Sequence, residues 1–126
     1  MTLTQWLAIG AGGALGAVAR AALGLWLNPK DSTALPWGTF AANLIGSLIL
    51  GVLLGLLLSE RMTSPTAKAL LATGFCGAFT TFSTFSIETF NLIEEGATGL
   101  ALANIAASVI VCLFAVWLGV LAGRMI

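Results

Sequence analysis

Residues 74–90, GFCGAFTTFSTFSIETF, combine glycines, a run of Thr and Ser, phenylalanines and one glutamate inside an apolar segment. Hydroxyls and a carboxylate are costly at membrane depth and mark candidate functional sites there. Gly74 and Gly77, followed by Thr80 and Thr81, favour a helix break near mid-membrane, with a kinked continuous helix as the alternative. Broken backbone is tolerated at that depth only where it is buried in protein or lines water, and its free carbonyls can bind a cation.

The composition of the whole chain also indicates a membrane protein. Its 126 residues are 59% hydrophobic and 8% charged, whereas a soluble domain has roughly a quarter charged residues. The net charge is zero and the chain has no histidine, so nothing suggests a nucleic-acid partner. Cys76 and Cys112 fall in apolar segments without a CxxC motif, and we interpret them as small buried side chains. We expect one domain over residues 1–126.

Hydropathy predicts an all-α protein with four membrane-spanning helices, each of about 20 residues or more, enough for about 30 Å of hydrocarbon. The predicted spans run over residues 3–27, 36–59, 65–95 and 99–123. Ser64 is a candidate N-cap for the third span, because Pro65 suits the first helical position.

The charged residues orient this bundle only weakly. An even number of spans puts both termini on one side of the membrane, together with Arg61, Lys68 and Arg124. The other side has Lys30, plus Arg20 if that residue lies near the interface. So small a bias is compatible with insertion in both orientations and an antiparallel homodimer. An ordinary oriented protein with few charges is the alternative.

Small and polar residues form stripes at i+4 spacing, which places them on one face of a helix. The stripes comprise Gly12, Gly16, Arg20 and Gly24; Thr39, Asn43, Ser47, Gly51 and Gly55; and Asn104, Ser108 and Cys112, with Gly119 and Gly123 further on. The glycine pairs predict close helix packing. Asn43 and Asn104 need hydrogen-bond partners at this depth, either on another helix or in a wet cavity.

Arg20 and Glu88 are the charged residues placed well inside predicted spans, and both are functional candidates for that reason. An Arg20–Glu88 ion pair is one interpretation, and an Arg20 side chain that reaches the interface is another. After the expected break, Phe82 and Phe85 share one helix face, and Thr84 lies with Glu88 on the neighbouring face.

These motifs resemble the Fluc fluoride channels, the CrcB family. GFCGAFTTFSTFSIE, residues 74–88, closely resembles the family's third-helix signature. GAGGALGAVAR, residues 10–20, resembles its first helix, and PWGTFAANLIGS, residues 36–47, resembles the start of its second. The length, the four spans and the charge-poor loops also fit, so the resemblance covers nearly the whole chain.

The resemblance implies a fluoride-selective channel, not an enzyme, that lets toxic fluoride leave passively across the plasma (inner) membrane. It implies an antiparallel, dual-topology homodimer in membrane lipid, with two pores. The expected pore residues are Asn43, Phe82, Phe85, Ser83, Thr84, Glu88, Ser108, Thr39 and Asn104, with Cys112 on the same wall as Ser108. It also implies a structural sodium ion at the centre of the dimer, held by the carbonyls of Gly77 and Thr80, and it aligns Arg20 with the family's first-helix arginine.

Neutral donors suit fluoride, because they can replace its water without trapping the ion. The amide of Asn43 and the hydroxyls of Ser83 and Thr84 are such donors. Phe82 and Phe85 can present the positive edges of their rings to an anion. A carboxylate in the same track either accepts hydrogen bonds from these hydroxyls or carries a proton.

A small multidrug-type proton-coupled exporter is the alternative function, since it would share the four spans and the antiparallel dimer. Such exporters have a membrane carboxylate on the first helix, whereas the deep acid here is Glu88 on the third. A scaffold without transport would need no broken helix and no track of hydroxyls. An enzyme is not expected, because no nucleophile–base pair is visible.

Overall fold

The computed structural model describes residues 1–28, 30 and 34–126, and these form four helical segments long and apolar enough to cross a membrane. The elements are α1 (Leu3–Leu27), α2 (Trp37–Leu58), α3 (Pro65–Lys68), the π-helical segment η1 (Ala69–Cys76), α4 (Gly77–Phe79), α5 (Phe82–Glu94) and α6 (Thr98–Met125). The pieces from α3 to α5 together make the third segment. The described residues contain no strand, so the prediction of an all-α, multi-pass membrane protein with four spans is confirmed.

Side-chain caps fix where two of these segments begin. Thr2 accepts from the Gln5 N–H, and the Gln5 side chain accepts from the Thr2 N–H, which makes a capping box at the start of α1. Ser64 accepts from the N–H of Ala67 at 3.2 Å, and Pro65 occupies the first turn of α3. The predicted cap at Ser64 is therefore confirmed.

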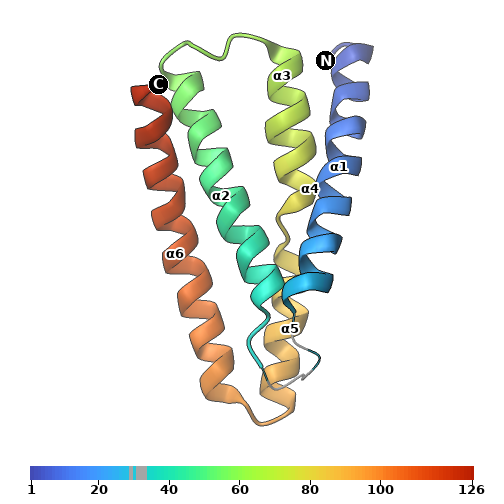
Figure 1. The fold of residues 1–126 in the computed structure, drawn as a ribbon, viewed down its shortest axis with the longest axis vertical. Helices are drawn as coiled ribbons and strands as arrows, with labels where there is room; N and C mark the ends of the chain where they lie inside the picture. The colour runs from blue at the N-terminus through green and yellow to red at the C-terminus, as the bar shows by residue number, and fades with distance from the viewer. Residues whose placement is uncertain (29, 31–33) are drawn as a thin grey trace.

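A tight turn between α5 and α6 reverses the chain. Gly96 has φ +80°, a left-handed conformation that glycine adopts without steric cost. The N–H of Gly96 donates to the Ile93 carbonyl at 3.0 Å, and the N–H of Ala97 donates to the Leu92 carbonyl at 2.8 Å. This Schellman pattern satisfies the last carbonyls of α5 and sends α6 back alongside it (Figure 1).

Glycines allow α2 and α6 to pack closely near the end of the bundle that carries the C-terminus, and Figure 1 shows the two helices diverging toward the other end. A Cβ atom on Gly51 would overlap the carbonyl oxygen of Val116, and one on Gly119 would overlap that of Leu48. The glycine face of α1 approaches η1 in the same way, since a Cβ on Gly12 would overlap a backbone carbonyl of η1. The predicted small-residue packing faces are confirmed on α1, α2 and α6.

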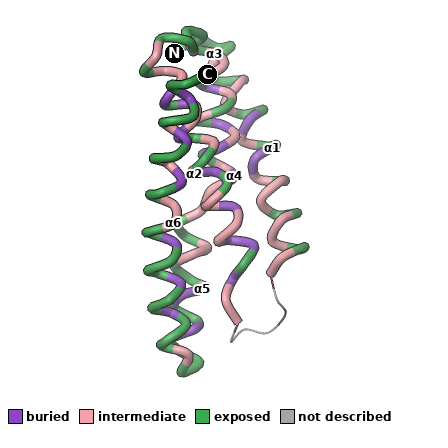
Figure 2. Tube along the Cα trace, turned by 60° about the vertical axis from the view of Figure 1, so that its left-hand side comes forward, coloured by how far each residue is buried: buried purple, intermediate pink, exposed green. Residues whose placement is uncertain are grey.

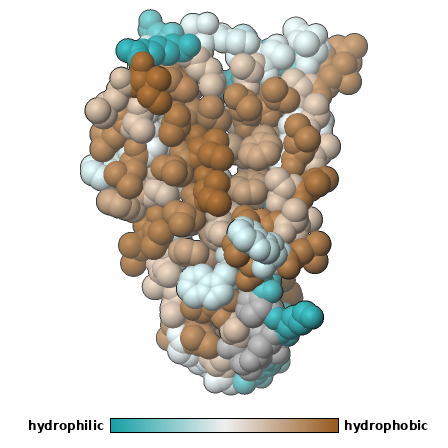
Figure 3. All heavy atoms as spheres, in the orientation of Figure 1, coloured by the Kyte–Doolittle hydropathy of each residue, from teal (hydrophilic) through white to brown (hydrophobic). Residues whose placement is uncertain are grey.

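The bundle leaves a large apolar surface uncovered. Figure 2 shows buried and exposed residues alternating along α6, and Figure 3 shows hydrophobic side chains over the middle of the visible face. Both termini and the turn between α2 and α3 lie at one end, and the α5–α6 turn lies at the other (Figure 1). Such a surface suits contact with lipid or with a second chain.

Adding a methyl group at Gly119 tests the packing of α2 on α6. We expect Gly119→Ala to destabilise the protein by about 1–3 kcal/mol, because the new Cβ meets backbone atoms that cannot move aside. The measurement is the thermal midpoint of the detergent-solubilised protein. Gly99→Ala is the control, since a Cβ at Gly99 meets no atom within 4 Å. Equal midpoints for the two variants would contradict the packing described here.

Candidate functional site

The third segment is not helical at Thr80 and Thr81, whose backbones are extended at φ −83°, ψ 157° and φ −154°, ψ 122°. In a continuous helix the N–H of Thr81 would donate to the Gly77 carbonyl, but here it donates to Oδ1 of Asn43 at 2.7 Å. The N–H of Thr84 donates to Oγ1 of Thr81 at 3.2 Å, and not to the Thr80 carbonyl. The carbonyls of Gly77 and Thr80 therefore lose their regular helical partners.

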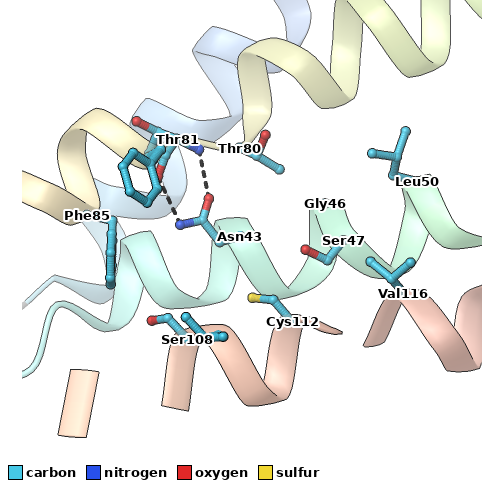
Figure 4. A pocket seen from close by; sticks show the side chains of 12 residues that line it. Asn43, Gly46, Ser47, Leu50, Thr80, Thr81, Phe85, Ser108, Cys112 and Val116 are labelled. Atoms are coloured by element: carbon cyan, nitrogen blue, oxygen red, sulfur yellow. Dashed lines mark hydrogen bonds between the residues drawn. The ribbon is translucent and has the colours of Figure 1, made fainter. Parts of the chain in front are cut away.

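Asn43 of α2 uses both ends of its carboxamide on Thr81 (Figure 4). Its Nδ2 donates to the Thr81 carbonyl at 3.0 Å, while its Oδ1 accepts from the Thr81 N–H. The amide thus replaces the peptide partners that the backbone of Thr81 lacks at the interruption. Nδ2 carries a second N–H that this pairing does not use.

A pocket of about 310 Å³ lies between α2, the interruption and α6 (Figure 4). It is lined by Asn43, Gly46, Ser47, Leu50, Thr80, Thr81, Phe82, Phe85, Ser108, Val109, Cys112 and Val116. The structure therefore brings together four of the predicted pore residues, namely Asn43, Phe82, Phe85 and Ser108, with Cys112 beside them. The lining is mostly apolar with a few neutral donors, and none of the described residues that form it is charged.

The two phenylalanines lie next to each other but differ in exposure. The ring centroids of Phe82 and Phe85 are 5.6 Å apart with an interplanar angle of 41°. Phe82 is 78% exposed on the single chain, whereas Phe85 is half-buried. Phe82 therefore contributes to the outer surface of the chain as well as to the pocket.

The other predicted polar residues gather away from this pocket. Arg20, Thr39 and Thr84 line a separate pocket of about 140 Å³, and Thr81 is common to both pockets. Oγ1 of Thr39 donates to Oε1 of Glu88 at 2.9 Å. In the described part of the chain, Oε2 of Glu88 is buried and finds no hydrogen-bond partner.

Ser83 stands apart from both pockets. It is exposed, and its hydroxyl lies 3.3 Å from Oγ1 of Thr81, the side chain that caps α5. Its remaining surroundings are open on the single chain.

Arg20 reaches the interruption and not Glu88. Its Nε donates to the carbonyl of Ala78 at 3.0 Å, and within the described residues no ion pair joins Arg20 to Glu88. The Arg20–Glu88 ion pair considered from the sequence is therefore not formed, because the guanidinium donates to the Ala78 carbonyl in α4. A basic side chain can satisfy the last carbonyls of a helix in this way.

Asn104 lies behind the wall of the larger pocket. It is buried, and its Nδ2 donates to Oγ1 of Thr89 at 2.9 Å. It borders a small cavity of about 50 Å³ near the start of α2. Of the two partners considered for an asparagine at this depth, another helix and a wet cavity, the structure supplies the helix.

Among the described lining residues, two polar ones were not assigned to the site from the sequence. Thr81 supplies the backbone that Asn43 binds. Its place in the threonine pair after Gly77 is the sequence feature that could have identified it as a site residue. Ser47 stands one turn from Asn43 on the stripe of α2. Among the described residues no group of three or more His, Cys, Asp or Glu is placed to hold a metal ion. The sodium site is predicted at backbone carbonyls instead, and nothing in the structure tests it, so it stays a prediction.

Comparison with known proteins places the chain in a family. The profile of the "CrcB-like protein, Camphor Resistance (CrcB)" family matches residues 7–120. The fluoride-specific ion channel FluC of Magnetococcus marinus is 46% identical over 121 residues, covering 96% of this chain and 97% of that protein. The fluoride-specific ion channel FluC 1 of Symbiobacterium thermophilum is 44% identical over 120 residues, covering 94% of this chain and 97% of that protein.

Each of these alignments covers nearly the full length of both sequences. The fluoride-specific ion channel FluC of Geotalea daltonii is likewise 44% identical over 118 residues. They agree with the resemblance found in the sequence motifs and give no support to the multidrug-exporter alternative. The chain belongs to the CrcB family.

Proposed function

We propose that this chain conducts fluoride passively across the plasma (inner) membrane, as an antiparallel homodimer with two pores. The observation that carries the proposal is the meeting of Asn43, Phe82, Phe85 and Ser108 at one pocket beside the interruption. The relatives named as fluoride-specific ion channels, aligned over nearly the whole chain, support the same function. Transport of this kind needs no catalytic residue.

The lining of the pocket suits a small anion in transit. The unused N–H of Asn43 and the hydroxyl of Ser108 are neutral donors that can replace water around fluoride. The edges of Phe82 and Phe85 add weak positive potential. Among the residues that the structure describes, no Lys or Arg lines the pocket, so an anion would not be held by a full positive charge and could leave.

Charge placement supports an antiparallel arrangement of two chains. One end of the chain carries Arg61, Lys68 and Arg124 with Glu60, while the other end, where the α5–α6 turn lies, carries Glu94 and Glu95 with Lys30 (Figure 1). In an antiparallel pair, the basic end of one chain meets the membrane face where the acidic end of its partner lies. The exposed ring of Phe82 would then find cover in the second chain.

The interruption, which we take as the helix break predicted at mid-membrane, fits a sodium ion at the centre of such a dimer. The carbonyls of Gly77 and Thr80 lack their regular N–H partners, and Gly77 is exposed on the single chain. Two carbonyl oxygens from each chain form a donor set suited to a hard cation. When bound, the ion would supply positive charge at the interface and join the two chains.

Removing the amide of Asn43 should nearly abolish fluoride transport. We expect liposomes with the native chain to release fluoride and not chloride, as read by ion-selective electrodes. Asn43→Ala should slow fluoride release roughly 30- to 140-fold, because it loses two hydrogen bonds worth about 1–1.5 kcal/mol each. Asn91→Ala is the control, since Asn91 is exposed near the end of α5. Undiminished release from Asn43→Ala would refute the pore assignment.

Replacing both pocket phenylalanines should separate ring chemistry from bulk. The double variant Phe82→Ile/Phe85→Ile keeps apolar side chains but loses the aromatic edges. We expect at least about a tenfold fall in fluoride release, with the dimer still intact by size-exclusion chromatography. Phe114→Ile is the matched control, because Phe114 is exposed on α6 and lies outside the pocket. Equal rates for the double variant and the control would remove the rings from the mechanism.

Dual insertion predicts two labelled populations at a single position. We expect Thr63→Cys, in a Cys76→Ala/Cys112→Ala background, to react with an impermeant thiol reagent from each side of the membrane in turn. Thr63 is exposed in the turn between α2 and α3, which favours access. Labelling from one side alone would exclude the antiparallel dimer and leave an oriented protein.

A further inference from the structure

A buried polar pair joins α5 to α6 one turn away from the larger pocket. Thr89 is 6% exposed and Asn104 is 3% exposed, and Nδ2 of Asn104 donates to Oγ1 of Thr89 at 2.9 Å. No other side-chain hydrogen bond between these two helices is found in the described part of the chain. Neither residue lines the larger pocket.

Each member of the pair is bonded to a residue that does line this pocket. Oγ1 of Thr89 donates to the carbonyl of Phe85 at 2.7 Å, one turn back along α5. The hydroxyl of Ser108 lies 3.5 Å from Oδ1 of Asn104, one turn further along α6. The four groups therefore form a chain from one pocket wall, behind the pocket, to the other wall.

We propose that Thr89 and Asn104 are positioning residues that fix Phe85 against Ser108 and so set the width of the conducting pocket. The expected effect on conduction rests on the proposed function, whereas the hydrogen bonds that link the two helices do not depend on it. α5 and α6 form the sides of a V that closes at the Gly96 turn (Figure 1). Thr89 and Asn104 lie between that turn and the pocket, where a fixed link determines how far the sides separate.

Polar groups at this point can fix the position of α5 relative to α6. α2 and α6 pack closely through glycines in the C-terminal half of each helix, whereas α5 has far less packing against α6. A directional hydrogen bond between buried groups defines one register where apolar packing would permit several. Loss of the Thr89 hydroxyl removes the acceptor of the Asn104 Nδ2 in a buried site, which is costly. Loss of Asn104 leaves Thr89 bonded only within its own helix, to the Phe85 carbonyl, so the link between the helices is lost in either case.

Isosteric variants test this link. We expect Thr89→Val, which removes the hydroxyl at nearly constant volume, to slow fluoride release about tenfold, and Asn104→Leu to do the same. The double variant should be no slower than either single one, because both break the same link. Thr89→Ser keeps the hydroxyl and should restore most of the native rate.

Ser86→Ala is the matched control for the loss of a hydroxyl from α5. Ser86 donates to the carbonyl of Phe82 at 2.8 Å within the helix but is exposed. A native rate in Thr89→Val, independent losses that multiply in the double variant, or an equal loss in Ser86→Ala would each overturn the proposal. All rates are compared at equal amounts of dimer, measured by size-exclusion chromatography.

Hydrogen exchange of α5 gives a readout that does not need conduction. We expect amides of residues 82–94 to exchange about tenfold faster in Thr89→Val than in Thr89→Ser, with little change in α2. Unchanged exchange would overturn the positioning role. If the native chain releases no fluoride, the proposed function fails, and the exchange comparison still decides whether the link holds α5.

Discussion

The pairing of the Asn43 carboxamide with the backbone of Thr81 is the interaction on which the site depends. Inside a membrane, an extended residue between two helices leaves an N–H and a C=O without water to satisfy them. One side chain meets both needs here, at 2.7 and 3.0 Å. Without it the chain would gain by continuing the helix through Thr81, and the pocket beside the interruption would lose its shape.

Other side chains at the interruption also satisfy backbone groups that lack a helical partner. Thr81 caps the first turn of α5 with its own hydroxyl, and Arg20 serves the carbonyl of Ala78. The carbonyls of Gly77 and Thr80 receive neither of these donors. Asn43, Arg20 and Thr81 are thus explained by one short piece of extended backbone, before any ligand is considered.

The spans, the Ser64 cap and the glycine faces could be predicted because each depends on neighbours in the sequence or on the need for close approach. Hydropathy determines a span over some 20 residues, and a Ser-Pro pair sets a helix start within one turn. The partners of Asn43, Arg20 and Asn104 could not be predicted, since they lie on other helices. A spacing of i+4 gives the face of a helix but not which helix that face meets.

The predicted track of polar residues divides into two groups on different sides of the interruption. Asn43, Phe85 and Ser108 border the larger pocket, whereas Arg20 and Thr39 border the smaller one. Sequence spacing could not separate the groups, because Thr39 of the smaller pocket and Asn43 of the larger one share a single i+4 stripe on α2.

The division also separates chemistry. The charged groups, Arg20 and Glu88, are absent from the lining of the larger pocket, which offers neutral donors and ring edges. Among the described residues, Thr81 is the one that belongs to both linings, so the two polar regions meet at its extended backbone. A helical Thr81 would direct its N–H along the helix axis and could not bind Asn43. The interruption therefore has two effects. It leaves backbone carbonyls without helical partners, and it holds the amide of Asn43 at the pocket.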